Sequence, residues 1–369
     1  MFATAAIRWT YRRALKPWYF RRDPEDVHDL MCRVGEKLGR YGITRGITDA
    51  IFDFEDPSLA QDVLGVRFRN PIGLSAGFDK DARLVDIIPS VGFGFEEVGS
   101  ITGEPCAGNP RPRLWRLPRS KGLVVYYGLK NDGADVVAAR LRGRSFGIPV
   151  GTSIARTNDA AHAGVEEGIE DYAKAFRLFA DVGAYFTVNI SCPNTCGGEP
   201  YTQPERLDLL LTALDRIKTR KPVLLKMPAD LSYAQTRALI ETSSAHRVHG
   251  FIFSNLTKKF DRPEIVQTEI TSHARGGISG RPAFAASNEL LSQAYGEYGS
   301  RFVFVASGGV FTAEDAYEKI RRGASLVQLI TGMIFEGPQL VGEINRGLVR
   351  LFARDGFANV REAVGAAHR

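Results

Sequence analysis

Residues able to do chemistry follow short apolar segments at regular intervals along the chain. They are small, hydroxyl and amide residues, two lysines and one thiol: Ala76, Gly77, Lys80, Ser100, Ser153, Asn189, Cys192, Asn194, Lys226, Ser254, Asn255, Gly309 and Thr331. The set contains no histidine, and histidines and carboxylates are what a catalytic metal needs. It therefore predicts no metal site. It suits a flat, polar cofactor that carries a phosphate.

Eight apolar segments place these residues, and helical patterns separate most of them. The segments are residues 71–77, 93–101, 148–155, 185–191, 222–227, 250–255, 302–309 and 326–332. Eight strands alternating with helices predict an α/β fold, a (β/α)8 TIM barrel, in which side chains at the C-terminal strand ends meet at one mouth. The chain has no early Gly-x-Gly-x-x-Gly that would favour a dinucleotide-binding sheet. The long gap over residues 102–147 predicts extra structure above the mouth.

The last two strand ends and Lys226 indicate what the mouth binds. Gly308-Gly309 and Gly332 allow backbone amides to approach a phosphate, and the segment from Thr331 can present a helix N-terminus to it. The simpler alternative is that the paired glycines only make turns. Lys226 would be a buried, unpaired cation unless it meets an anion, and a reduced flavin is one.

Positive charge is concentrated at the N-terminus. The chain has a formal net charge of +6, and residues 1–22 contain six basic and no acidic residues, so the remainder is formally neutral. A basic arm of this kind does not indicate a nucleic-acid-binding body. With 369 residues and four cysteines, the chain suits one large barrel with a small appendage in a reducing compartment.

The N-terminal arm combines aromatic residues with these cations at helical spacing. Ile7, Tyr11 and Leu15 share a face, and Pro17 is expected to break or bend the segment. Asp23 is expected to cap a second helix, with Pro24 in its first position. Such a pair of helices predicts an N-terminal helical extension over residues 1–45, before a barrel over residues 46–369. We expect residues 1–40 to lie on a membrane surface and to admit a lipid-soluble ligand. The alternatives are a helix packed on the protein's own body and a transit peptide.

Five segments together resemble the dihydroorotate dehydrogenase family. They are residues 78–81 (Phe-Asp-Lys-Asp), 109–114 (Asn-Pro-Arg-Pro-Arg-Leu), 189–195 (Asn-Ile-Ser-Cys-Pro-Asn-Thr), 276–282 (Gly-Gly-Ile-Ser-Gly-Arg-Pro) and 323–328 (Gly-Ala-Ser-Leu-Val-Gln). The Asp-Pro-Glu-x-x-His element that begins at Asp23 is similar to the membrane-bound, quinone-using class. The resemblance implies a non-covalent FMN and oxidation of (S)-dihydroorotate to orotate in pyrimidine biosynthesis, with a quinone as electron acceptor.

The resemblance also implies roles for individual residues. Cys192 takes the place of the proton-abstracting base, and Lys226 stabilises negative charge on the flavin. The residues that match flavin contacts are Ala76, Gly77, Lys80, Ser100, Ser153, Asn189, Lys226, Ser254, Gly280, Gly309 and Thr331. Those that match substrate contacts are Lys80, Asn189, Asn194, Asn255, Tyr127, Gly128 and Leu129.

Four positions depart from the family pattern. Cys192 replaces the serine usual in the membrane class, and a thiol with an ordinary pKa near 8.5 is the better base near neutrality. Val125 and Leu256 replace an amide and a hydroxyl that bind the substrate, and Ser153 replaces a flavin-contacting asparagine. Each lost hydrogen bond to substrate costs roughly 1–3 kcal/mol.

Three hypotheses remain open at this stage. The first is a membrane-associated, quinone-dependent dihydroorotate dehydrogenase, at the cytoplasmic face of the inner membrane if the source is bacterial. The second is an FMN oxidoreductase of the same family that acts on a different substrate. The third is a non-catalytic flavin-binding or structural barrel. We expect a small-molecule substrate, no nucleic-acid partner, and a monomer or weak dimer.

Overall fold

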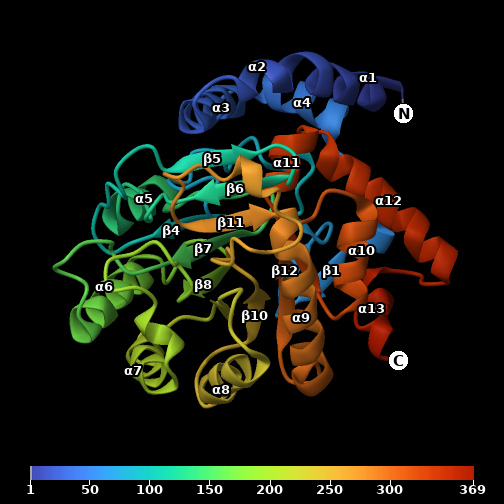
Figure 1. Ribbon diagram of the computed structural model, residues 1–369. Coiled ribbons are helices and arrows are strands. Elements are labelled where there is room, and N and C mark those ends of the chain that lie inside the picture. The colour runs from blue at the N-terminus through green and yellow to red at the C-terminus, as the bar shows by residue number, and fades with distance from the viewer. Residues whose placement is uncertain (1) are drawn as a thin grey trace.

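The computed structural model describes residues 2–369, and its centre is a closed barrel of eight parallel strands (Figure 1). In sequence order these strands are β3 (Ile72–Leu74), β4 (Phe95–Ile101), β7 (Val150–Ile154), β8 (Tyr185–Asn189), β9 (Val223–Lys226), β10 (Gly250–Phe253), β12 (Val303–Ser307) and β13 (Leu326–Leu329). Each predicted segment contains one of them, and β13 pairs with β3 to close the ring. The predicted TIM barrel is confirmed.

Helices cover the outside of the barrel (Figure 1). They are α5 (Ala134–Leu141), α6 (Val165–Leu178), α7 (Pro204–Asp215), α8 (Tyr233–Ser243), α9 (Phe284–Tyr298), α10 (Ala313–Arg321), α11 (Thr331–Glu336), α12 (Leu340–Asp355) and α13 (Val360–Ala363). Between β3 and β4 the chain forms a short 3-10 helix (Pro89–Val91) in place of an α-helix. The apolar faces of these helices and the outer faces of the strands form one continuous core.

Two small sheets close the ends of the barrel. The hairpin of β1 (Gln61–Val63) and β2 (Val66–Phe68) packs Val63 and Phe68 against the N-terminal parts of the strands. Strands β5 (Leu114–Leu117), β6 (Gly122–Val125) and β11 (Gly277–Gly280) form an antiparallel sheet. Two of its strands come from residues 102–147, as predicted for this excursion. The loop of residues 126–130, which carries the predicted substrate contacts Tyr127, Gly128 and Leu129 and is called the substrate loop below, therefore begins at the end of β6.

The N-terminal extension is entirely helical and lies beside β5, β6 and α11 (Figure 1). It comprises α1 (Phe2–Thr10), a π-helical segment (Tyr11–Leu15), α2 (Lys16–Phe20), α3 (Pro24–Gly39) and α4 (Gly42–Phe52). The predicted boundary after residue 45 therefore falls inside α4. The helix does not end at Pro17, because the wider π-helical turn comes just before it and proline is tolerated near the start of α2.

The predicted start of α3 is confirmed. Asp23 accepts hydrogen bonds from the backbone N–H groups of Glu25 (2.9 Å) and Asp26 (3.1 Å), and Pro24 opens the helix. Among the described helices, none is both long and apolar enough to span a bilayer.

Candidate active site

Most of the predicted site residues line one cavity at the mouth of the barrel. The cavity has a volume of about 180 Å³. Its predicted members are Ala76, Gly77, Lys80, Ser100, Tyr127, Gly128, Leu129, Asn189, Cys192, Asn194, Lys226, Asn255 and Thr331. Residues from six strand ends and from the sheet above them thus meet in one space, which agrees with the rule that barrel chemistry lies at the C-terminal strand ends.

A second cavity of about 90 Å³ adjoins the first and is lined by the predicted phosphate residues Gly308, Gly309 and Gly332, together with Ser254 and Gly280, which were predicted as flavin contacts. Its wall requires glycine in two places. Gly309 has φ +75° and a Cβ there would lie 2.5 Å from Cβ of Phe284, while Gly280 has φ +90° and a Cβ would lie 2.3 Å from a backbone oxygen. Such turns bring backbone close to a ligand, so this end of the site suits a phosphate.

Lys226 lies where both cavities meet and is almost fully buried. Its Nζ donates to Ser75 Oγ at 3.4 Å, and it makes no ion pair with any described residue. Burial lowers the pKa of this lysine, while the charges of Glu97 and Cys192 act in the opposite direction. A buried cation without a partner suits an anionic or electron-rich ring above it, so the residues present fit a flavin.

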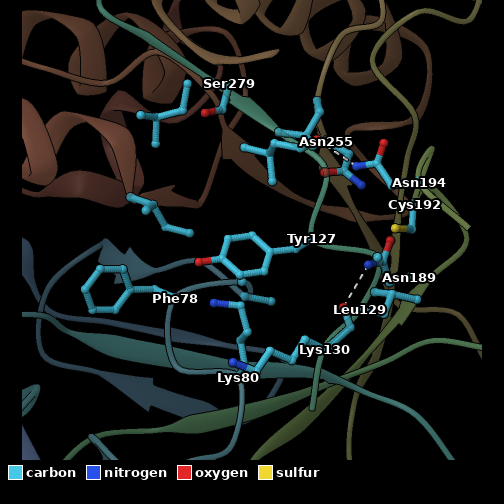
Figure 2. Close-up of a pocket in the computed structure, with 18 of the residues that line it drawn as sticks. Phe78, Lys80, Tyr127, Leu129, Lys130, Asn189, Cys192, Asn194, Asn255 and Ser279 are labelled. Carbon is cyan, nitrogen blue, oxygen red and sulfur yellow. Dashed lines mark hydrogen bonds between the residues drawn. The ribbon is translucent and has the colours of Figure 1, made fainter. Parts of the chain in front are cut away.

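A hydrogen-bonded network fixes the amide of Asn189 on the β8 side. Asn189 Nδ2 donates to Ser100 Oγ at 2.8 Å (Figure 2). Its Oδ1 accepts from the Ser191 hydroxyl at 2.9 Å. Ser153 lines neither cavity: its hydroxyl lies behind Ser100, 2.7 Å from Ser100 Oγ. In this arrangement Ser153 supports Ser100, and Ser100 is the residue that reaches the cavity.

Cys192 follows β8 and faces the cavity beside Asn194 and Asn189 (Figure 2). Burial raises the pKa of its thiol to about 11. This pKa lies above the ordinary value near 8.5, because the thiolate loses its hydration there. The thiol is held almost entirely in its neutral form at pH 7.

Lys80 occupies the opposite side of the cavity, against Tyr127 (Figure 2). Its Nζ lies 4.0 Å from the centre of the Tyr127 ring and 3.4 Å from Nε2 of His28. Burial lowers the pKa of Lys80 to about 8, and burial also lowers the pKa of His28. The imidazole is therefore neutral near pH 7, and Lys80 remains the cation of this wall.

A third, apolar cavity of about 320 Å³ lies between the N-terminal helices and the barrel. It shares five lining residues with the mouth cavity: His28, Phe78, Leu114, Leu123 and Ile334. The apolar space under α2 and α3 therefore reaches the site from the side of Lys80, opposite Cys192.

Ion pairs hold the extension against the barrel. Glu25 on α3 and Arg113, which immediately precedes β5, are both buried and pair at 2.7 Å. The Tyr11 hydroxyl donates to the Ile334 backbone oxygen at 2.7 Å, and Arg12 pairs with Glu336. The N-terminal arm therefore packs on the protein's own body, which was one of the alternatives to a position on a membrane surface.

Comparison with known proteins identifies the family. The model of the dihydroorotate dehydrogenase family matches residues 58–352. The chain belongs to the dihydroorotate dehydrogenase family. Among curated members, dihydroorotate dehydrogenase (quinone) of Natronomonas pharaonis is 40% identical over 358 residues, 95% of this chain and 97% of the relative. The protein of the same name from Gloeobacter violaceus is 37% identical over 362 residues, 96% of this chain and 98% of the relative.

A solved structure has the same fold over nearly the whole chain. DHODH from Eimeria tenella in complex with ferulenol superposes with a TM-score of 0.82 at 30% identity, covering 94% of this chain and 96% of that one. Members of the dihydroorotate dehydrogenase family are flavin-dependent oxidoreductases, and this chain is one of them.

Several lining residues of this family member were not predicted as site residues. His28 was noted only as part of the Asp-Pro-Glu-x-x-His element, and its place in the wall depends on how α3 docks. Lys130, two residues after Gly128, lines the cavity and extends to 3.7 Å from Glu25. Val125 and Leu256, singled out as departures, both line the mouth cavity.

Proposed function

We propose that the protein binds FMN and oxidises (S)-dihydroorotate to orotate with a quinone as acceptor. The observation that carries this proposal is the meeting of two cavities of opposite character. One is lined by Cys192, Lys80 and three amides, and the other is apolar and reaches the same centre. A polar substrate and an apolar acceptor can each approach one flavin from its own side.

FMN would be held along the two adjoining cavities at the strand ends. Gly280, Gly309 and Thr331 would receive its phosphate, and Ala76, Gly77 and Ser100 would border its ring. When bound, FMN supplies a two-electron acceptor for hydride. Lys226, which lines both cavities, would place a buried positive charge beside the flavin and would stabilise negative charge that develops on it.

The chain's own residues bind the substrate and move its proton. Lys80 would pair with the substrate carboxylate, while Asn189, Asn194 and Asn255 would hold its ring amides. Cys192 would remove the C5 proton as hydride leaves C6. Because the thiol is buried, a thiolate there has few competing hydrogen bonds and is a strong base.

The quinone would enter through the apolar cavity, and the N-terminal helices would rest on a membrane. Large apolar residues of these helices are exposed, including Trp9 (66%) and Ile43 (79%), next to the cluster of basic residues. Apolar and basic residues together favour a surface of anionic lipid. If the source is bacterial, this surface is the cytoplasmic face of the inner membrane.

The first experiment adds (S)-dihydroorotate to the anaerobic, flavin-loaded protein and follows the loss of flavin absorbance. We expect bleaching within seconds at sub-millimolar substrate, and recovery of the absorbance on addition of a short-chain ubiquinone. Cys192→Ala is the control: it should retain the flavin and lose rapid bleaching. A yellow wild-type protein that stays oxidised would overturn the proposed substrate.

Membrane association has its own test. The protein is sedimented with vesicles of neutral lipid, or of neutral lipid with anionic lipid added. We expect more protein to sediment with the anionic vesicles, and less after Ile43→Ser, because that side chain is the most exposed of the apolar set. Equal sedimentation of both proteins with both vesicles would contradict the assignment of this face.

A further inference from the structure

Lys319 on α10 is a fully buried lysine without a carboxylate partner. Its Nζ donates to Ser287 Oγ at 2.9 Å, to Asn288 Oδ1 at 2.7 Å and to the Ser307 carbonyl at 3.5 Å. None of the ion pairs among the described residues includes it. Burying an ammonium group in this way is costly unless a negative charge compensates for it.

The acidic groups nearest to Lys319 are already paired with arginines. Asp315 accepts two hydrogen bonds from Arg281, at 2.9 and 2.8 Å, and Glu318 pairs with Arg322 at 3.1 Å. These four are the charged groups that face the lysine, and α9 adds only neutral side chains beside it. The region around Lys319 therefore has one uncompensated positive charge.

This charge lies directly behind the wall of the phosphate cavity. The Ser307 carbonyl that it contacts precedes Gly308 and Gly309, and all three residues line that cavity. A Cβ on Gly308 would lie 3.5 Å from Ser287 Oγ, a partner of the ammonium. A Cβ on Gly309 would lie 2.5 Å from Cβ of Phe284, and the centre of the Phe284 ring lies 4.9 Å from Lys319 Nζ. One layer of atoms separates the ammonium from the cavity.

We propose that Lys319 is a positioning residue for the cofactor phosphate: it orders the Ser307–Gly309 turn and makes the site select a phosphorylated flavin over the phosphate-free one. The inference rests on the proposed FMN cofactor. Across a dry protein layer a unit charge acts strongly on a phosphate dianion, although the two groups do not touch. The three hydrogen bonds also hold the turn with its amides available to the phosphate.

Binding of the phosphate should also change the protonation of Lys319. Burial lowers the pKa of Lys319 to about 7, so part of the protein carries a neutral lysine before the phosphate binds. A bound dianion favours the charged form and raises this pKa. Binding of the phosphorylated flavin should therefore take up protons that binding of riboflavin does not.

The test measures binding of FMN and of riboflavin to the flavin-free protein by quenching of flavin fluorescence. We expect Lys319→Met to weaken FMN binding by about 10- to 100-fold, the effect of one unit charge at an effective dielectric constant of about 20. Riboflavin binding should change little. Lys221→Met is the matched control. Lys221 is a half-buried lysine whose pKa is also lowered to about 7 by burial, but it precedes β9 at the other end of the barrel.

The outcomes separate this inference from the proposed cofactor. If Lys319→Met weakens FMN and riboflavin equally, the lysine is only structural and the inference is wrong. If the wild-type protein binds riboflavin as tightly as FMN, the phosphate site and the inference both fail. Calorimetry of the wild-type protein at pH 8, in two buffers of different ionisation enthalpy, needs no variant: equal proton uptake for both flavins would overturn the inference.

Discussion

The pH dependence of flavin reduction follows from the burial of Cys192. Its thiol has a pKa raised to about 11, so the basic form is present in about one molecule in 10,000 at pH 7. If this thiolate removes the substrate proton, the rate at saturating dihydroorotate should rise about tenfold per pH unit between pH 7 and 9. A thiol with an ordinary pKa near 8.5 would instead give a plateau above that pH.

Lys80 adds a second, opposite dependence at low substrate concentration. Its pKa is lowered to about 8, so the free protein loses this positive charge as pH rises through 8. The substrate carboxylate then binds more weakly, while saturated complexes keep Lys80 charged because the carboxylate stabilises the ammonium. The ratio of the reduction rate to the substrate Kd should therefore flatten above pH 8, where the saturated rate continues to rise.

Stopped-flow absorbance under anaerobic conditions measures both quantities, with wild-type protein and Cys192→Ala compared from pH 6 to 9.5. The alanine variant should show a slow and nearly pH-independent reduction. A wild-type rate at saturation that does not change with pH, or an alanine variant that keeps the same slope, would show that Cys192 is not the base.

Three further predictions concern the pocket, the extension and the phosphate turn. Val125→Asn adds an amide to the mouth cavity and should tighten dihydroorotate binding by about tenfold or more, measured by flavin absorbance. An unchanged Kd would show that other residues of the substrate loop already replace the hydrogen bond that Val125 cannot make. Arg113→Met leaves the Glu25 carboxylate buried without its closest partner and should lower the free energy of unfolding by roughly 3 kcal/mol, measured by denaturant titration. This is near the lower limit for such a loss because Arg111 and Lys130 also face Glu25. Adding Glu25→Gln should restore part of the lost stability. Gly309→Ala should release FMN and lower the melting temperature more than Gly143→Ala does. Both glycines have φ near +75°, but only Gly309 has neighbouring atoms, those of Phe284, where the new Cβ would lie. Equal effects of the two substitutions would exclude a steric cause.

The barrel was predictable because each strand appears in the sequence as a short apolar run with a polar or glycine end. Such local patterns determine which residues reach the mouth, and the alternation with helices determines how many strands there are. The start of α3 was predictable for the same reason, since Asp23 and Pro24 are adjacent to the helix they begin. Family resemblance then supplied the role of Cys192, which the pattern alone leaves undefined.

Features that depend on contacts between distant segments were not predictable. The pair of Glu25 with Arg113 joins residues 88 positions apart, and it places α3 over the substrate loop. The pKa of Cys192 depends on how completely the fold buries it, and composition gives no measure of that. Ser153 lies near the C-terminal end of β7, but Ser100 reaches the cavity and Ser153 does not.

The residues shared by the mouth cavity and the apolar cavity indicate where the substrate and the quinone would each approach the flavin in the proposed reaction. Cys192 lines the mouth cavity and does not line the apolar cavity, while His28 and Phe78 line both of them. In the proposed reaction the proton therefore leaves on the β8 side, and the acceptor arrives on the α3 side. His28 is held at this border because its Nε2 lies 2.9 Å from the Phe78 carbonyl. Since burial keeps the imidazole neutral, this border separates a charged site from an apolar one without adding a charge to either.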